Sequence, residues 1–171
     1  MASTLTLHIR PLWDDIEPMR QQVLAFLLAQ DMSSDTADAV AMVASELTEN
    51  ATKYGLAAGE EDRIEVTLSM GERSVAVEVK CRVPPREVEN LRRLDRMIQW
   101  LRGFQDPFEA YVERLNQVSS EGLDSKESGL GLARIAYEGQ SILDFYVDSG
   151  DVLAVSAVHQ LPPAGGQGHG R

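Results

Sequence analysis

The sequence predicts an α+β fold in which helices cover one face of a mixed, mostly antiparallel sheet, giving a two-layer sandwich. Strand-like segments gather into two pairs, and each pair is joined by a short turn that contains glycine, as in β-hairpins. Helical segments do not alternate one for one with strands, as they would in a doubly wound parallel fold. A chain of 171 residues, 43% of them hydrophobic, is long enough to form one domain with its own core.

The first third of the chain predicts a strand and two helices. Residues 4–10 alternate polar and apolar side chains, as a half-buried strand does. Residues 14–30 form a helix with a broad apolar face, and a second helix runs to about residue 54, where Gly55 closes it. Three residues can cap the start of that second helix: Ser33, Ser34 and Asp35.

Two hairpins follow. Apolar side chains alternate over residues 64–68 and 75–79, so the first hairpin buries one face. Residues 142–147 and 152–158 form the second hairpin about a Ser-Gly turn. The strands of both hairpins are therefore expected to share one sheet.

Helical segments separate the two hairpins. Residues 86–101 and 107–118 have helical patterns, residues 119–128 form a polar loop, and residues 130–137 form a short helix opened by glycines. The first segment has an apolar stripe, which most simply packs on the domain's own sheet; the alternative is that it docks a partner or a second copy. The stripe consists of Leu91, Leu94, Met97, Ile98 and Leu101.

Composition limits the classes of function. A net charge of −11 makes the chain a poor general ligand for nucleic acid or anionic membranes. The single cysteine, Cys81, excludes an internal disulfide and fits a reducing compartment. No leader and no membrane-spanning run is visible, so we expect a cytoplasmic protein. We expect one domain over residues 1–161, with a helical lid insertion at about 86–128, and a disordered tail at 162–171.

The end of the second helix carries chemically complementary side chains. Glu46, Asn50 and Lys53 follow at i, i+4 and i+7, so they project from one side of the helix. A carboxylate can accept a proton, an amide oxygen can bind a hard cation, and an ammonium can face phosphate oxygens. The set suits a magnesium–triphosphate site. The same spacing also occurs on solvated helix faces, although Asn50 and Thr52 are poor choices for a plain helix interior.

A second motif opens the short helix. Gly129 and Gly131 allow close approach of the backbone, and the helix N-terminus offers N–H groups and a positive dipole to a phosphate. Two glycines before a helix are by themselves more often a turn than a phosphate site. The segment is neither a Walker loop nor a complete dinucleotide fingerprint.

In this order, the two motifs resemble those of the GHKL (Bergerat-type) ATP-binding fold of histidine kinases, gyrase, Hsp90 and MutL. Within that group the chain is most similar to the small anti-sigma-factor serine kinases of bacterial partner-switching systems. Residues 46–54 look like the N-box of the family, and residues 129–132 look like its second glycine box. The resemblance covers roughly residues 4–158.

The resemblance implies a role for each matching residue. Glu46 would be the general base toward the terminal phosphate, and Asn50 would hold magnesium. Lys53 would contact the phosphate chain, and Tyr54 would flank the nucleotide. The second glycine box, which would wrap the phosphates, consists of Gly129, Leu130, Gly131 and Leu132. The implied cofactors are ATP and magnesium, and the implied partner is an anti-sigma-antagonist-like or other signalling protein, with a homodimer as a further assembly.

One part of the family pattern is missing. After the third strand the family usually has an Asp-x-Gly-x-Gly box, whose aspartate hydrogen-bonds the adenine amino group. Residues 78–85 here contain neither aspartate nor glycine; Lys80 or Cys81 stands near the place of the aspartate, and Pro84 and Pro85 can seal the adenine space. Two functions therefore remain open: an ATP-dependent serine/threonine protein kinase, or a non-catalytic protein-interaction module with weak or no nucleotide binding.

Overall fold

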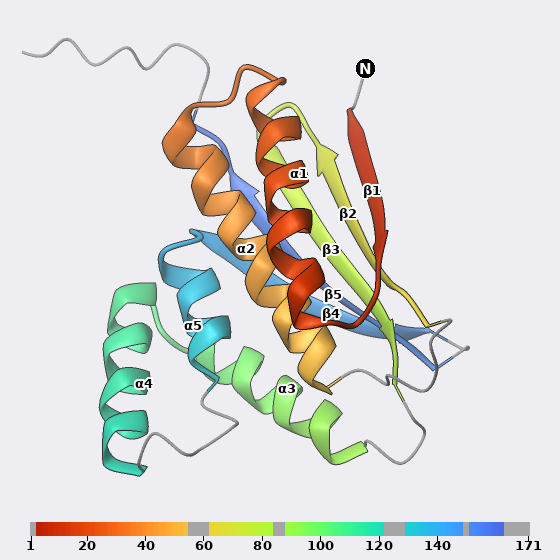
Figure 1. Ribbon diagram of the computed structural model, residues 1–171. Coiled ribbons are helices and arrows are strands. Elements are labelled where there is room, and N and C mark those ends of the chain that lie inside the picture. Colours follow the sequence, from red (N-terminus) through yellow and green to blue (C-terminus); the bar gives the residue numbers. More distant parts are fainter. Residues whose placement is uncertain (1–2, 55–61, 84–87, 122–128, 149–150, 163–171) are drawn as a thin grey trace, which may run out of the picture.

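The computed structural model describes residues 3–54, 62–83, 88–121, 129–148 and 151–162. The protein is a two-layer α+β sandwich, as predicted: a five-stranded sheet is covered on one face by helices (Figure 1). The strands are β1 (Thr4–Ile9), β2 (Ile64–Met70), β3 (Ser74–Arg82), β4 (Ser141–Asp148) and β5 (Val152–Gln160). The helices are a 3-10 turn η1 (Trp13–Asp15), α1 (Ile16–Leu28), α2 (Ser34–Tyr54), α3 (Val88–Arg102), α4 (Pro107–Glu121) and α5 (Leu130–Tyr137).

The sheet has the strand order β1-β2-β3-β5-β4, and every pair of neighbours is antiparallel. Its register puts the alternating apolar side chains on one face. Leu68 of β2 pairs with Val77 of β3, Val77 pairs with Ala157 of β5, and Ala157 pairs with Leu143 of β4. One row of small and branched side chains therefore crosses four strands and forms the floor of the core.

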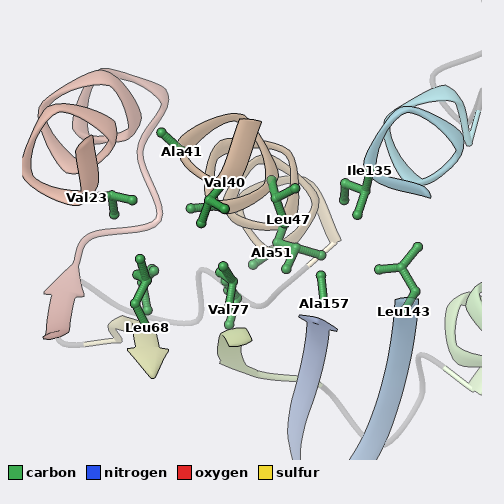
Figure 2. Packing of buried hydrophobic residues seen from close by; sticks show 14 of the residues in the cluster. Val23, Val40, Ala41, Leu47, Ala51, Leu68, Val77, Ile135, Leu143 and Ala157 are labelled. Carbon is green, nitrogen blue, oxygen red and sulfur yellow. The ribbon is translucent and has the colours of Figure 1, made fainter. Parts of the chain in front are cut away.

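Helices α1, α2 and α5 lie over this row (Figure 1). Figure 2 shows Val40 and Leu47 of α2 above Val77, and Ile135 of α5 above Leu143. All five side chains are buried. Burying an aliphatic side chain contributes about 1.5–3 kcal/mol, so this layer contact holds α2 and α5 at fixed positions over the sheet.

Local signals explain where α2 begins and why polar groups inside it are tolerated. The Oγ atom of Ser33 accepts a hydrogen bond from the Thr36 N–H at 3.3 Å, so Ser33 is the cap among the three candidates. Thr48 is fully buried, and its hydroxyl donates to the Ala44 carbonyl at 2.7 Å. The predicted closure by Gly55 lies outside the described residues.

The element boundaries differ from prediction mainly at helix ends. The segment expected as one helix over 14–30 is η1 followed by α1, and Asp31 with a φ of 58° turns the chain away after it. The predicted loop over 119–128 begins as helix, because α4 continues to Glu121. Residues 122–128, Pro84, Pro85 and residues 163–171 of the tail lie outside the described chain. None of the described helices combines the length and apolar character that crossing a bilayer requires.

Candidate functional site

A cavity of about 620 Å³ lies between the end of α2, the start of α5, the helices α3 and α4, and the inner face of β3 and β5. Six of the eight predicted site residues line it: Glu46, Asn50, Lys53, Gly129, Gly131 and Leu132. Leu130 is the first residue of α5 and is half-buried, but it is not among the residues that line the cavity. Tyr54 is the last residue of α2, and its side chain lies outside the described part. The two sequence motifs therefore meet at one cavity.

Glu46 lies where the two motifs touch. Its side chain is 15% exposed, and its Oε1 atom accepts a hydrogen bond from Nη1 of Arg134 at 2.8 Å. Its Oε2 atom lies against α5, since a β-carbon added at Gly131 would be 2.6 Å away from it. Only glycine leaves room for the carboxylate at that distance. The positive end of the α5 dipole further favours a negative charge there.

Arg134 links Glu46 to a second carboxylate. Its Nε atom donates at 2.7 Å to Oε2 of Glu138, the residue that caps the C-terminal end of α5. The hydrogen bond to Glu138, and then the one to Glu46, raises the pKa of Arg134, so the guanidinium stays charged. Sequence reasoning missed Arg134. Its position, three residues after Gly131 and on a helix that opens at the site, was the available signal.

Glu49 adds a second carboxylate to the cavity wall, three residues after Glu46. Burial raises the pKa of Glu49, the nearby Glu46 carboxylate raises it further, and Arg134 opposes both effects. Glu49 was also missed, although it lies inside the N-box itself. Its spacing of three residues from Glu46 was enough to put both carboxylates on neighbouring ridges of the helix.

Gly129 begins α5 in a left-handed conformation, with a φ of 62°. A β-carbon there would collide with the Cε atom of Met97 on α3. The left-handed backbone conformation therefore favours glycine, and any larger residue would also have to push aside the terminal methyl group of Met97. This contact brings the helical insertion directly onto the second glycine box.

The floor of the cavity is apolar. The strand register of β3 shows whether Lys80 or Cys81 faces the cavity. Val79, Cys81, Leu153 and Val155 of β3 and β5 line the floor. Lys80 is on the opposite face of the sheet, where its ammonium lies 3.1 Å from Glu78 and 3.5 Å from Glu65. Of the two candidates, Cys81 therefore faces the cavity and Lys80 does not. Burial raises the pKa of the Cys81 thiol to about 11, so it stays protonated near neutral pH.

The apolar stripe of α3 packs on its own domain. Leu91, Leu94 and Met97 line the cavity, while Ile98 and Leu101 are buried in the core. The stripe thus faces the inside of its own domain, as the simpler reading expected, but α3 packs beside α5 and the cavity and does not lie flat on the sheet. The stripe covers the space between α2, α5 and the floor, as a wall of the cavity.

The insertion also changes the charge of the cavity. Arg93 and Arg96 of α3 and Arg114 of α4 line it together with Lys53. Among the described lining residues, these four cations face two carboxylates, those of Glu46 and Glu49. A chain with a net charge of −11 therefore lines this cavity with more cationic than acidic side chains, although Arg96 also forms an ion pair with Glu89 at 2.9 Å. This excess favours an anionic ligand. The three arginines were missed because the sequence does not tell which face of an insertion turns inward.

The oxygen atoms that line the cavity fit a magnesium ion that is bound partly by the protein and partly by a phosphate ligand. No group of three or more histidine, cysteine, aspartate or glutamate side chains that could hold a metal occurs in the described ranges. Asn50 offers an amide oxygen beside the two carboxylates. Magnesium is commonly bound by one or two protein oxygens, with water and phosphate oxygens completing its octahedron. The site therefore fits a metal that arrives with a polyphosphate.

Comparisons with known proteins agree with this geometry. The family model of the histidine kinase-like ATPase domain matches residues 9–137. No curated protein matches the sequence. Among solved structures, a chain of the SiaB–SiaC complex from Pseudomonas aeruginosa superposes with a TM-score of 0.65 and 20% identity, over 92% of this chain and 89% of that one. That likeness shows the fold, and the family model covers most of the sequence. The chain belongs to the histidine kinase-like ATPase domain family, as the GHKL motifs of α2 and α5 predict.

Proposed function

We propose that this protein binds magnesium–ATP in the cavity and acts as a serine/threonine protein kinase of the anti-sigma-factor type. The observation that carries the proposal is that Glu46, Asn50, Gly129 and Gly131 line one cavity, whose wall has more cationic than acidic side chains. In the reaction, a bond forms between a serine or threonine oxygen and the γ-phosphorus. The bond from that phosphorus to the bridging oxygen breaks, ADP leaves, and the hydroxyl proton passes to the Glu46 carboxylate.

The other residues of the site would bind and orient the nucleotide. Asn50 would hold magnesium, which neutralises phosphate charge when bound. Lys53 would face the phosphate chain, and Tyr54 would flank the nucleotide. The backbone N–H groups at the start of α5 would receive phosphate oxygens, with Gly131 leaving space for them. Helices α3 and α4 would serve as a lid, since Met97 already contacts the glycine box.

The partner is proposed to be an anti-sigma-antagonist-like or other signalling protein of a bacterial partner-switching system. The structure with the similar fold is described as a complex between two proteins, SiaB and SiaC, which supports a protein partner for this chain too. A reducing, cytoplasmic location suits the free Cys81 thiol. Light scattering of the purified protein would determine whether it also forms a homodimer.

Calorimetric titration with magnesium–ATP and magnesium–GTP tests the proposal most directly. We expect the wild type to bind ATP, Asn50→Ala to lose the magnesium-dependent part of that binding, and Glu46→Ala to bind ATP but transfer phosphate at least about 100-fold more slowly. A folded Glu46→Ala protein that transferred phosphate at the parental rate would remove Glu46 from the mechanism.

A second function is favoured by one observation, the apolar floor around Cys81 where the family usually has a base-reading aspartate. The described side chains of the floor offer no carboxylate to a purine edge, so specificity for adenine would fall. The alternative is a non-catalytic interaction module on the same fold. If neither nucleotide bound at millimolar concentration, this alternative would replace the kinase.

A further inference from the structure

We propose that Arg134 is a positioning residue for Glu46: it holds one carboxylate oxygen, so that the other faces the glycine box. This inference rests on the proposed function, in which Glu46 accepts the proton of the attacking hydroxyl. It assigns a task to a residue outside both motif cores, on the helix that the second motif opens.

The two oxygens of Glu46 have different neighbours. Oε1 is bonded to Nη1 of Arg134 at 2.8 Å. Oε2 lies next to the α-carbon of Gly131, at the wall of the cavity. A carboxylate that is fixed at one oxygen can rotate little about its last bond. Oε2 therefore keeps its direction toward the space where a phosphate at the α5 N-terminus would receive an incoming hydroxyl.

Arg134 is itself held in place from the other side. Nη1 bonds to Glu46 while Nε bonds to Glu138 at 2.7 Å, so one planar group is fixed by two carboxylates. A guanidinium presents several N–H donors in a rigid plane, and an ammonium cannot reproduce this geometry. Arg134 lies on α5 and Glu138 is the C-cap of that helix, so the position of Glu46 is tied to the helix that presents the phosphate-binding N–H groups.

Charge gives Arg134 a second effect on the same wall. Glu49 lies close enough to Glu46 for the two carboxylates to repel each other, and Arg134 offsets that repulsion. Without the guanidinium, the two side chains are expected to move apart, because like charges at three-residue spacing destabilise each other. Glu46 would then leave its place beside Gly131.

The expected effect is on turnover and not on binding. A displacement of a reacting group by about 1 Å costs on the order of 100-fold in rate. We therefore expect Arg134→Met to reduce kcat by about 10- to 100-fold and to leave the Kd for magnesium–ATP within about threefold of the wild type. Arg134→Lys should recover part of the loss, since it keeps the charge but only one of the two bonds.

The experiment uses the full chain and magnesium–ATP alone, with water as acceptor and ADP as the measured product. Glu138→Gln is the matched control, because it removes the charge of the outer partner while the Gln amide oxygen can still accept from Nε, and it leaves the bond to Glu46; its kcat should stay within about twofold. Circular dichroism confirms that each variant is folded. In a Glu46→Ala background, Arg134→Met should cause no further loss, since the residue it positions is already gone.

The outcomes separate this inference from the proposed function. If the wild type turns over ATP and Arg134→Met does so at the same rate, Arg134 is not a positioning residue and the proposed function stands. If Arg134→Met lowers turnover equally with and without Glu46, the residue acts independently of Glu46 and the inference is wrong. If the wild type binds ATP but transfers its γ-phosphate neither to water nor to the serine or threonine of a partner protein, the catalytic proposal fails and this inference fails with it.

Discussion

Gly131 and Glu46 are in direct apposition: a β-carbon on Gly131 would lie 2.6 Å from the Oε2 atom of Glu46. The first residue belongs to α5 and the second to α2, so the acid of one motif rests on the glycine of the other. Each motif has ordinary structural explanations when read separately. The contact explains why residue 131 is glycine. A turn does not explain it, because Gly131 already lies inside helix α5.

This contact predicts the effect of Gly131→Ala. Alanine is the better helix former by about 1 kcal/mol, so the variant is expected to fold. The new methyl group must displace the Glu46 carboxylate, so magnesium–ATP turnover should fall tenfold or more. Gly71→Ala, in the β2–β3 turn, is a matched glycine-to-alanine control that should keep parental turnover. Parental turnover in Gly131→Ala itself would contradict the role of this contact.

Cys81 predicts a stability change at alkaline pH. The side chain is 8% exposed, and burial raises its pKa from 9.0 to about 11. The folded protein thus holds the thiol proton more tightly than the unfolded chain does. The resulting stabilisation is fully present below pH 9 and is lost as the pH rises toward 11. Across this range the stability of the wild type relative to Cys81→Ala should fall by up to about 3 kcal/mol.

Denaturant unfolding of both proteins between pH 8 and pH 11 measures this difference. Because lysines and tyrosines titrate equally in the two proteins, the comparison isolates Cys81. A difference that stays constant over the whole range would show that the thiol ionises as easily in the folded protein as in the unfolded one.

The periodicity of apolar residues predicted most of the helices and strands. Which side chains face the cavity depends on contacts between residues that are distant in the sequence, and these could not be predicted in the same way. The family pattern left Lys80 and Cys81 as two candidates for the place near the missing aspartate, although Cys81 continues the apolar alternation of β3. Pairing with β2 and β5 decides between them, since it places Lys80 with Glu65 on the outer face. Arg134 meets Glu46 across 88 positions, which no local pattern encodes. The motif residues could be predicted because their spacing is set by one helix.

Glu49 predicts a gain in stability on losing its charge. Burial, and then Glu46, raises its pKa, so the folded protein holds this proton more tightly than the unfolded chain. That stabilisation is present below the ordinary pKa of 4.5 and is lost as the pH rises above it. Glu49→Gln should therefore be more stable than the wild type at pH 7, and the gain should shrink toward pH 4.

Urea midpoints at pH 7 and pH 4 test this prediction. Glu72→Gln, in the exposed β2–β3 turn, controls for removing one negative charge from an acidic chain. Because Arg134 lowers the pKa of Glu49, the gain from Glu49→Gln should increase in an Arg134→Met background. If Glu49→Gln were no more stable than the Glu72→Gln control at pH 7, burial and the Glu46 charge would not destabilise the ionised Glu49 carboxylate, and the prediction would be wrong.

Gly139, which follows α5, lets that helix pack closely against α2, and this close packing leads to a further prediction. A β-carbon there would collide with the Ile135 carbonyl oxygen and lie 2.5 Å from Cγ2 of Val43 on α2. Gly139→Ala should therefore destabilise the fold by about 1–3 kcal/mol, as overpacking does, measured by denaturant unfolding. Adding Val43→Ala should relieve only the α2 side of the clash, since the other obstacle is backbone. A Gly139→Ala protein as stable as the wild type would mean that α2 and α5 can move apart at no cost. The close packing at Gly139 would then not explain why Glu46 lies against Gly131.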